Sequence, residues 1–362
     1  MIDPSATGAP AVPEAPALRL GARTSPLARA QVDLVARLLA QHGTGSSFVG
    51  VTTTGDVDPR LLTEIGGTGV FANAVRDALR LDKIDCAVHS LKDLPTAAEA
   101  DLEVISVPGR EDVRDVMVGS RLADLPDGAR VGTGAPRRAM QLLEWAQAQG
   151  RYLEVVPVRG NVDTRIELAR TGGLDAVVLA GAGLRRLGYL EAGLSDSDKS
   201  DDAGYDTDVK GLPAEVLSED LMLPAPGQGA LALEVRRSLG GLERAAVLLL
   251  DDPVAHAEVL AERAFLATLE AGCTAPVGVR ARVVGRRGNA LDLTMRAVVE
   301  RTLLDTLSVM TKSPPPVRTT VSGSTTDPAA FGSDLARSVL AQLSDEARRQ
   351  AGPPQARHDG AQ

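Results

Sequence analysis

The sequence predicts an α/β protein with two lobes built on mainly parallel sheets, followed by a C-terminal α+β domain with a three-stranded antiparallel sheet. Two observations predict the lobes. Short apolar runs alternate with amphipathic stretches from Leu18 to about residue 194, and the runs read as apolar on both faces, as parallel strands do. A third observation predicts the last domain: after Asp252 one long helical stretch precedes several strand-like runs.

The first lobe begins with a strand at 18–23, after which Ser25 and Pro26 are expected to be the N-cap and first residue of a helix. A strand at 47–54, a helix at 71–82 and a buried strand at 84–90 continue the alternation. The expected buried faces of the two helices comprise Leu27, Ala30, Leu34 and Leu38, and Phe71, Val75 and Leu79.

A second set of strands and helices follows from Val116, with Asn161 as the expected cap of one helix. Its predicted strands are 129–134, 153–160 and 174–183, and its predicted helices are 136–149, 161–172 and 183–190. The Asp-rich segment 195–208 is predicted to be a solvated loop, and it lacks the spacing of a calcium-binding loop.

The third domain is expected to contain a long helix ending near Gly272, strands at 277–285, 290–300 and 302–311, and a helix at 328–349. The resulting division of the chain is a disordered tail (1–17), a discontinuous first domain (18–113 with 217–240), a second domain (114–194), an acidic loop and crossover (195–216), a third domain (250–349) and a frayed tail (350–362).

Composition excludes several classes of partner. Aromatic residues make up 2% of the chain and the net charge is -9, which argues against nucleic-acid binding. The chain has no run of the roughly 18 apolar residues that a membrane span requires, and its N-terminal residues do not resemble a secretory signal. A cytoplasmic protein is therefore expected. The two cysteines exclude a disulfide framework and a four-cysteine zinc site, and no metal site is predicted.

The two cysteines differ in their surroundings. Cys273 follows a helix in a loop of small residues, where its thiol is expected to be accessible and nucleophilic, although a buried structural thiol is the alternative. Cys86 lies within an apolar run and suits the structural role. A Cys-His-Asp hydrolase is a rival interpretation, but no histidine lies in a recognisable local motif of that class.

A polar stretch follows the buried strand at 84–90. Ser90, Lys92 and Asp93 are expected on the cleft side of the sheet, where a carboxylate beside an ammonium is poised for proton transfer or for holding a cation. The alternative is a surface Lys-Asp pair in a turn. His89 is interpreted as a hydrogen-bonded strand residue rather than a metal ligand.

Arginines cluster near predicted strand ends. Thr133 precedes a helix start, where free N–H groups favour an anion, and Ser25 holds the corresponding place in the first lobe. The arginines are Arg23, Arg137, Arg138, Arg159, Arg165 and Arg186. Together they predict a cleft for a ligand with several carboxylates, whereas each one taken alone is better interpreted as a solvated surface charge.

Seven ordered motifs resemble those of the hydroxymethylbilane synthase (porphobilinogen deaminase) family from Leu18 to at least Gly278. They are RTSPLARAQ, AVHSLKDLPT, GTGAPRR, RGNVDTR, LAGAGLRRLG, LPAPGQGALALE and ERAFLATLEAGCTAPVG. The resemblance implies a cytosolic, monomeric enzyme of three domains whose first two are similar to periplasmic-type binding lobes. It also implies that the segment LPAPGQGALALE returns to the first lobe.

The same resemblance implies the chemistry. In the family, porphobilinogen loses ammonia to give an electrophilic azafulvene, four additions build a chain, and hydrolysis releases the linear tetrapyrrole 1-hydroxymethylbilane for porphyrin and haem biosynthesis. A dipyrromethane cofactor, itself assembled from porphobilinogen, is held as a thioether by the cysteine that matches Cys273, and Asp93 matches the catalytic aspartate. The resemblance gives cofactor contacts to Ser90, Lys92, Asp93, Thr133, Arg137 and Arg138, and substrate contacts to Arg23, Ser25, Arg159, Arg165 and Arg186.

The chain departs from the family pattern at two loops. Thr68 stands where a lysine is common, and Gly134 to Pro136 replace a hydroxyl-rich sequence, so fewer side-chain contacts to the cofactor are expected there. The alternative function is a two-lobe carboxylate-binding protein or sensor without catalysis. Cys273 and Asp93 discriminate between the two, because a binding protein needs neither a thioether anchor nor a poised acid.

Overall fold

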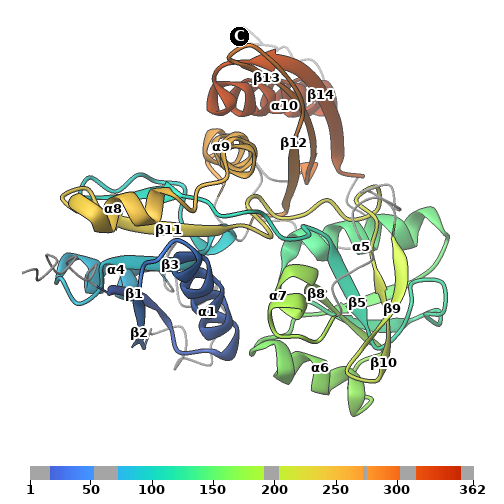
Figure 1. Cartoon of the computed structure of the whole chain (residues 1–362). Coiled ribbons are helices and arrows are strands. Elements are labelled where there is room, and N and C mark those ends of the chain that lie inside the picture. Colours follow the sequence, from blue (N-terminus) through green and yellow to red (C-terminus); the bar gives the residue numbers. More distant parts are fainter. Residues whose placement is uncertain (1–16, 53–71, 191–203, 272–274, 302–314, 352–362) are drawn as a thin grey trace, which may run out of the picture.

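The computed structural model describes residues 17–52, 72–190, 204–271, 275–301 and 315–351. Two α/β lobes lie side by side, and the C-terminal domain lies across one end of both (Figure 1). No helix in these ranges is long and apolar enough to cross a membrane.

The first lobe is built on a five-stranded sheet in the order β2-β1-β3-β11-β4. Pairing is parallel between β1 and its neighbours β2 and β3, and antiparallel between β11 and its neighbours β3 and β4. The strands are β1 (Leu18–Arg23), β2 (Ser46–Val51), β3 (Cys86–Ser90), β4 (Leu102–Ser106) and β11 (Leu231–Arg236). The late strand β11 therefore returns to the first lobe, as the family resemblance implied.

The second lobe is built on a six-stranded sheet in the order β7-β6-β8-β5-β10-β9. Here β6 is parallel to its neighbours β7 and β8. The other pairs, β5 with β8, β5 with β10, and β10 with β9, are antiparallel. The strands are β5 (Asp115–Val118), β6 (Ala129–Gly132), β7 (Leu153–Val156), β8 (Ala176–Ala180), β9 (Tyr205–Val209) and β10 (Leu212–Val216).

Both sheets are thus mixed, and the expectation of mainly parallel sheets holds only for the βα units. The reason is topological. The chain crosses between the lobes twice, near residues 107–115 and 217–230. Strands β5 and β11 each begin where the chain arrives from the other lobe, and each runs against its neighbours. Apolar strand patterns do not distinguish the two directions.

Helices cover the two sheets. They are α1 (Pro26–Gln41), α4 (Asn73–Arg80), η1 (Leu91–Asp93, a 3₁₀ turn), α5 (Pro136–Ala148), α6 (Val162–Arg170), α7 (Gly181–Arg186) and α8 (Gly241–Leu248). The predicted caps are confirmed, since Ser25 Oγ accepts from Ala28 N and Asn161 Oδ1 accepts from Thr164 N.

The buried face of α1 is shifted by one residue from the predicted one. Ala28, Val32, Val35 and Leu39 are buried, whereas Leu27, Ala30, Leu34 and Leu38 are only partly so. Both sets recur at helical spacing, so periodicity alone does not select between them. In α4, Val75 and Leu79 are buried as predicted, and Phe71 lies outside the described residues.

The prediction of a loop at 195–208 is wrong for its last residues. Residues 205–209 form β9, which pairs antiparallel with β10 at the edge of the second sheet. Asp206 and Asp208 are exposed there while Val209 is buried, so the acidic side chains remain solvated within a paired strand. Residues 191–203 lie outside the described ranges.

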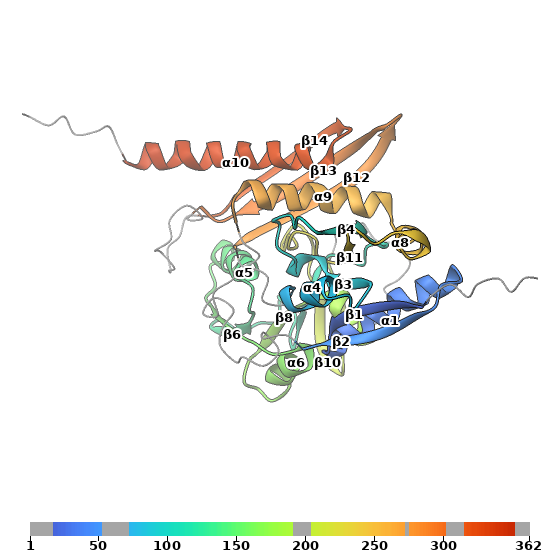
Figure 2. The ribbon, with the colours of Figure 1, turned by 90° about the vertical axis from the view of Figure 1, so that its left-hand side faces the viewer.

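The C-terminal domain has an antiparallel sheet in the order β12-β13-β14, with α9 and α10 packed together against it (Figure 2). Its elements are α9 (Pro253–Thr268), β12 (Val277–Arg287), β13 (Ala290–Val299), β14 (Val317–Thr325) and α10 (Pro328–Ala351). The three-stranded sheet is confirmed, but its third strand is β14, a segment not predicted from sequence. The run at 302–311 proposed for that place lies outside the described residues.

Candidate active site between the lobes

A pocket opens at the edge of the first sheet where β1 and β3 end. Because these two strands are parallel, their carboxyl ends meet at one edge, and the side chains that follow them share the pocket. Its polar lining includes Arg23, Ser25, Gln31, Ser90 and Asp93. The structure therefore brings together four residues selected from the sequence and adds Gln31, whose Nε2 donates to Ser90 Oγ at 2.8 Å.

Asp93 ends the 3₁₀ turn η1 and is exposed at this pocket. Its neighbours Leu91 and Leu94 are buried, which fixes the turn on both sides of the carboxylate. Lys92 does not line the pocket. Its Nζ donates to Gln228 Oε1 at 3.2 Å, and burial together with the nearby Arg138 lowers the pKa of Lys92 to about 8.

Arg137 and Arg138 begin α5 and are both buried. Their guanidinium groups each lie 2.8 Å from an oxygen of Asp115, the first residue of β5. Although burial opposes ionisation, the two arginines hold the pKa of Asp115 far below its usual range. This internal counter-ion was not recognised in the sequence, where both arginines were assigned to ligand carboxylates.

Arg159 and Arg165 flank the start of α6 on the second lobe. Burial and then the charges of Arg138 and Arg159 lower the pKa of Arg165 to about 10, while Asp93 of the first lobe acts in the opposite direction. Arg159 Nη1 is buried and has no hydrogen-bond partner among the described residues. An unpaired buried donor is unfavourable without an anionic ligand or water, so this atom favours a ligand site.

Two other predicted site residues have internal roles in the structure. Arg186 Nη2 donates to Gly229 O at 2.6 Å, and burial lowers the pKa of this arginine to about 10. Thr133 is buried, and its hydroxyl accepts from Ala135 N at the start of α5. Neither residue lines the pocket beside Asp93.

Cys273 and Thr68 lie outside the described residues. Cys86 is buried in β3, and burial raises the pKa of its thiol far above its usual range. The structural role predicted for Cys86 is therefore confirmed. His89 is a hydrogen-bonded strand residue, as predicted, since its Nε2 lies 3.1 Å from Glu234 Oε2.

Sequence reasoning missed the partners that hold these residues. Asp115 and Gln228 are separated by more than a hundred residues yet are joined by a hydrogen bond of 2.9 Å. Glu234 binds both His89 and Arg76 in a buried cluster. Asp115 and Glu234 each lie within a run of strand residues. Because a buried charge is retained only when it is paired, a carboxylate in such a run indicates a buried cationic partner.

Fold and site together define a two-lobe α/β protein with a cationic site at the junction of its lobes and an exposed carboxylate beside it. Two family models match the chain: "Porphobilinogen deaminase, dipyromethane cofactor binding domain" over residues 18–242, and "Porphobilinogen deaminase, C-terminal domain" over residues 256–341. The chain belongs to the porphobilinogen deaminase family.

Curated relatives agree with this assignment. Porphobilinogen deaminase 1 of Streptomyces coelicolor is 46% identical over 330 residues, which cover 90% of this chain and 95% of the relative. Porphobilinogen deaminase of Leifsonia xyli is 48% identical over 74% of this chain and 76% of its own. A periplasmic substrate-binding protein from Coxiella burnetii, 17% identical, is similar at a TM-score of 0.35 over 68% of this chain and 94% of its own.

Proposed function

We propose that this chain is a hydroxymethylbilane synthase, a transferase that joins four porphobilinogen molecules head to tail with loss of ammonia. One observation carries the proposal: Asp93, an exposed carboxylate, lies in a pocket with Arg23 and Ser25, and its charge also acts on Arg165 of the second lobe. A substrate that carries carboxylates and becomes cationic on losing ammonia requires both kinds of charge.

Asp93 is assigned the catalytic role. Its carboxylate accepts from pyrrole N–H groups and stabilises the positive charge that develops when the carbon–nitrogen bond to the leaving amine breaks. In its protonated form it donates to the departing ammonia. Arg23, Ser25, Arg159, Arg165 and Arg186 are assigned to substrate carboxylates, and Ser90, Lys92, Thr133, Arg137 and Arg138 to those of the cofactor.

The described residues fit a dipyrromethane. Lys92, Arg137, Arg138, Arg159 and Arg165 outnumber the nearby carboxylates Asp93 and Asp115, so the site retains positive charge for an acidic ligand. The unpaired Arg159 Nη1 supports the same conclusion. When bound, the dipyrromethane supplies the pyrrole terminus to which the units are added. Cys273 is assigned as its anchor, because a thiolate is nucleophilic enough to be alkylated and the thioether that forms is stable.

The intact mass of the purified protein tests this function. We expect it to exceed the sequence mass by one dipyrromethane, and incubation with porphobilinogen to add discrete steps of one substrate less ammonia. A protein at its sequence mass that binds porphobilinogen without consuming it would instead be the carboxylate-binding protein considered from the sequence. The proposed enzyme is cytoplasmic and monomeric, and size-exclusion chromatography with light scattering tests the second point.

A further inference from the structure

Gln228 lies at the point where the two lobes meet and is buried. Its Nε2 donates to Val113 O at 2.7 Å and to Asp115 Oδ1 at 2.9 Å. Its Oε1 accepts from Lys92 Nζ at 3.2 Å. Both amide hydrogens and the carbonyl oxygen of this side chain are therefore used, and they join a residue of the pocket turn to the second lobe.

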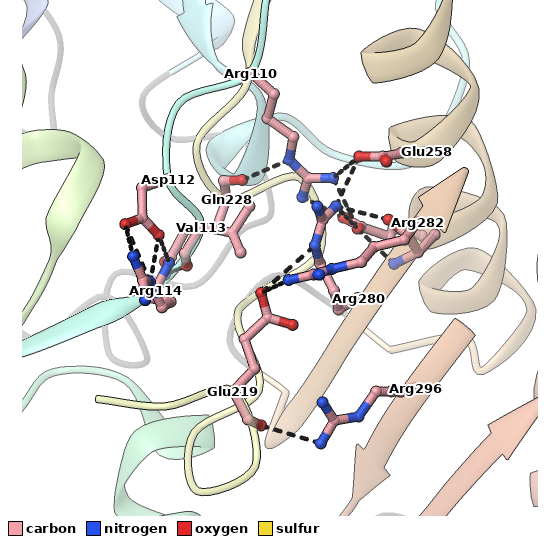
Figure 3. A network of polar contacts seen from close by, with 12 residues as sticks. Arg110, Asp112, Val113, Arg114, Glu219, Gln228, Glu258, Arg280, Arg282 and Arg296 are labelled. Atoms are coloured by element: carbon pink, nitrogen blue, oxygen red, sulfur yellow. Dashed lines mark hydrogen bonds and ion pairs between the residues drawn. The ribbon is translucent and has the colours of Figure 1, made fainter. Parts of the chain in front are cut away.

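The backbone around Gln228 is held from the C-terminal domain. Arg110 Nε donates to Gln228 O at 3.0 Å, and the same guanidinium is paired with Glu258 and Glu262 of α9 (Figure 3). Glu262 Oε2 also accepts from Gly227 N at 2.7 Å. These contacts fix the main chain on which the Gln228 side chain is mounted.

We propose that Gln228 is a positioning residue that holds the Lys92 ammonium at the junction of the lobes and couples it to the Asp115–Arg137–Arg138 cluster. The proposal rests on the proposed function in that Lys92 is assigned to bind cofactor carboxylates. Val113 O and Asp115 Oδ1 are both acceptors, so they require the NH₂ end of the amide. The carbonyl end is left for Lys92, which has only donors, so the side chain has one satisfied orientation.

Charged side chains of both lobes also act on the Lys92 ammonium. Arg137 and Arg138 of α5 disfavour its charged form, while Asp93 of η1 and Asp115 of β5 favour it. Burial also disfavours the charge. A neutral acceptor at Gln228 stabilises the ammonium without adding a further carboxylate, which would neutralise the positive charge that the ligand requires.

The test is the titration of Lys92 measured by NMR of protein labelled with ¹³C at lysine Cε. The chain has five lysines, and Lys92→Arg assigns the signal. Gln228→Met keeps the length of the side chain but removes the acceptor, so we expect the pKa of Lys92 to fall by about one unit. Gln228→Glu adds an anion beside an excess of cations, so we expect a rise of about one unit.

Gln141→Met is the matched control. Gln141 is equally buried, and it exchanges hydrogen bonds with the main chain of Leu223 but with no lysine of the described ranges. We expect this variant to leave the Lys92 titration unchanged. A Lys92 titration that is unaltered in Gln228→Met, or in Gln228→Glu where the Met variant does not fold, overturns the proposal. The readout needs no turnover, so it is separate from the test of the enzyme activity.

Discussion

The guanidinium of Arg263, on α9, donates to Pro95 O at 2.6 Å and to Leu94 O at 3.1 Å. These carbonyls follow directly after Asp93. Burial lowers the pKa of Arg263, and the adjacent Arg76 acts in the same direction. The helix that leads toward Cys273 therefore also holds the turn that carries the exposed carboxylate.

Arg263→Met is expected to reduce turnover by about 10- to 100-fold, because the turn carrying Asp93 loses both of these donors and a misplaced catalytic group is costly. Arg263→Lys should recover part of the activity, since a lysine ammonium can donate to a carbonyl but lacks the two separate nitrogens with which the guanidinium reaches both. Steady-state consumption of porphobilinogen measures the effect. Arg337→Met, which breaks only an exposed pair with Asp334 on α10, is the control. Unchanged turnover in Arg263→Met would show that the turn is held without α9.

Asp93→Asn is expected to fold, to retain a cofactor-like adduct by mass and to lose at least about 10²-fold in turnover. The amide keeps the shape but has neither the negative charge nor the transferable proton. Asp101→Asn, an exposed carboxylate paired with Arg80, serves as the control. Near-normal turnover of the Asp93 variant would refute its catalytic assignment.

Cys273→Ser is expected to fold without covalent cofactor and to be inactive, because a hydroxyl does not form the stable thioether. Cys86→Ala should retain both cofactor and activity, since the Cys86 thiol is buried and its pKa is raised. Intact-mass measurement separates the two. Extra mass that persists in the Cys273 variant, or disappears in the Cys86 variant, contradicts the anchor assignment.

Arg159→Leu and Arg138→Leu should differ in their effects on thermal stability and on the reaction. Arg138 is paired with buried Asp115, so its loss leaves that carboxylate with Arg137 and should lower the melting temperature as well as impair cofactor assembly. Arg159 Nη1 has no described hydrogen-bond partner, so its variant should melt near wild type and accumulate partly elongated species. Thermal melting and native mass spectrometry report the two effects. The assignment would be contradicted if both variants lowered the melting temperature equally and both gave the same series of enzyme-bound intermediates as wild type.

Glu234 provides a pH-dependent test of the buried cluster. Burial opposes its ionisation, but hydrogen bonds from His89 and Arg76 lower the pKa of Glu234 from its usual value of 4.5 to about 2. Because the folded pKa is the lower one, its contribution to stability is complete above about pH 4.5 and is lost as pH falls toward 2.

Glu234→Gln should therefore show a free energy of unfolding that depends less on pH in this window than that of wild type. Urea unfolding at several pH values between 5 and 2.5 measures the slope, and Glu243→Gln on the surface of the same lobe is the control. Identical slopes in wild type and Glu234→Gln would remove Glu234 from the acid response.

Local patterns predicted most elements, because helical and strand periodicities are written in consecutive residues, as for the cap at Ser25 and the buried strand that contains Cys86. Asp93, Arg23 and Ser25, which the sequence selected as candidate site residues, line one pocket in the structure. The sequence could not predict strand direction, the β9 edge strand or the pairing of Asp115 with Arg137 and Arg138. Strand direction and the Asp115 pairing depend on contacts between residues far apart in the sequence, which periodicity does not encode. The β9 strand instead pairs with the adjacent β10, and its acidic side chains concealed its strand character.

The position of β11 has a consequence for synthesis on the ribosome. The strand that separates β3 from β4 is made only after the whole second lobe, more than a hundred residues later. Until it emerges, a nascent first lobe has unpaired edges on both β3 and β4. The first lobe therefore cannot complete its sheet before the second lobe has been made, and until β11 arrives the open edges of β3 and β4 are available for aggregation.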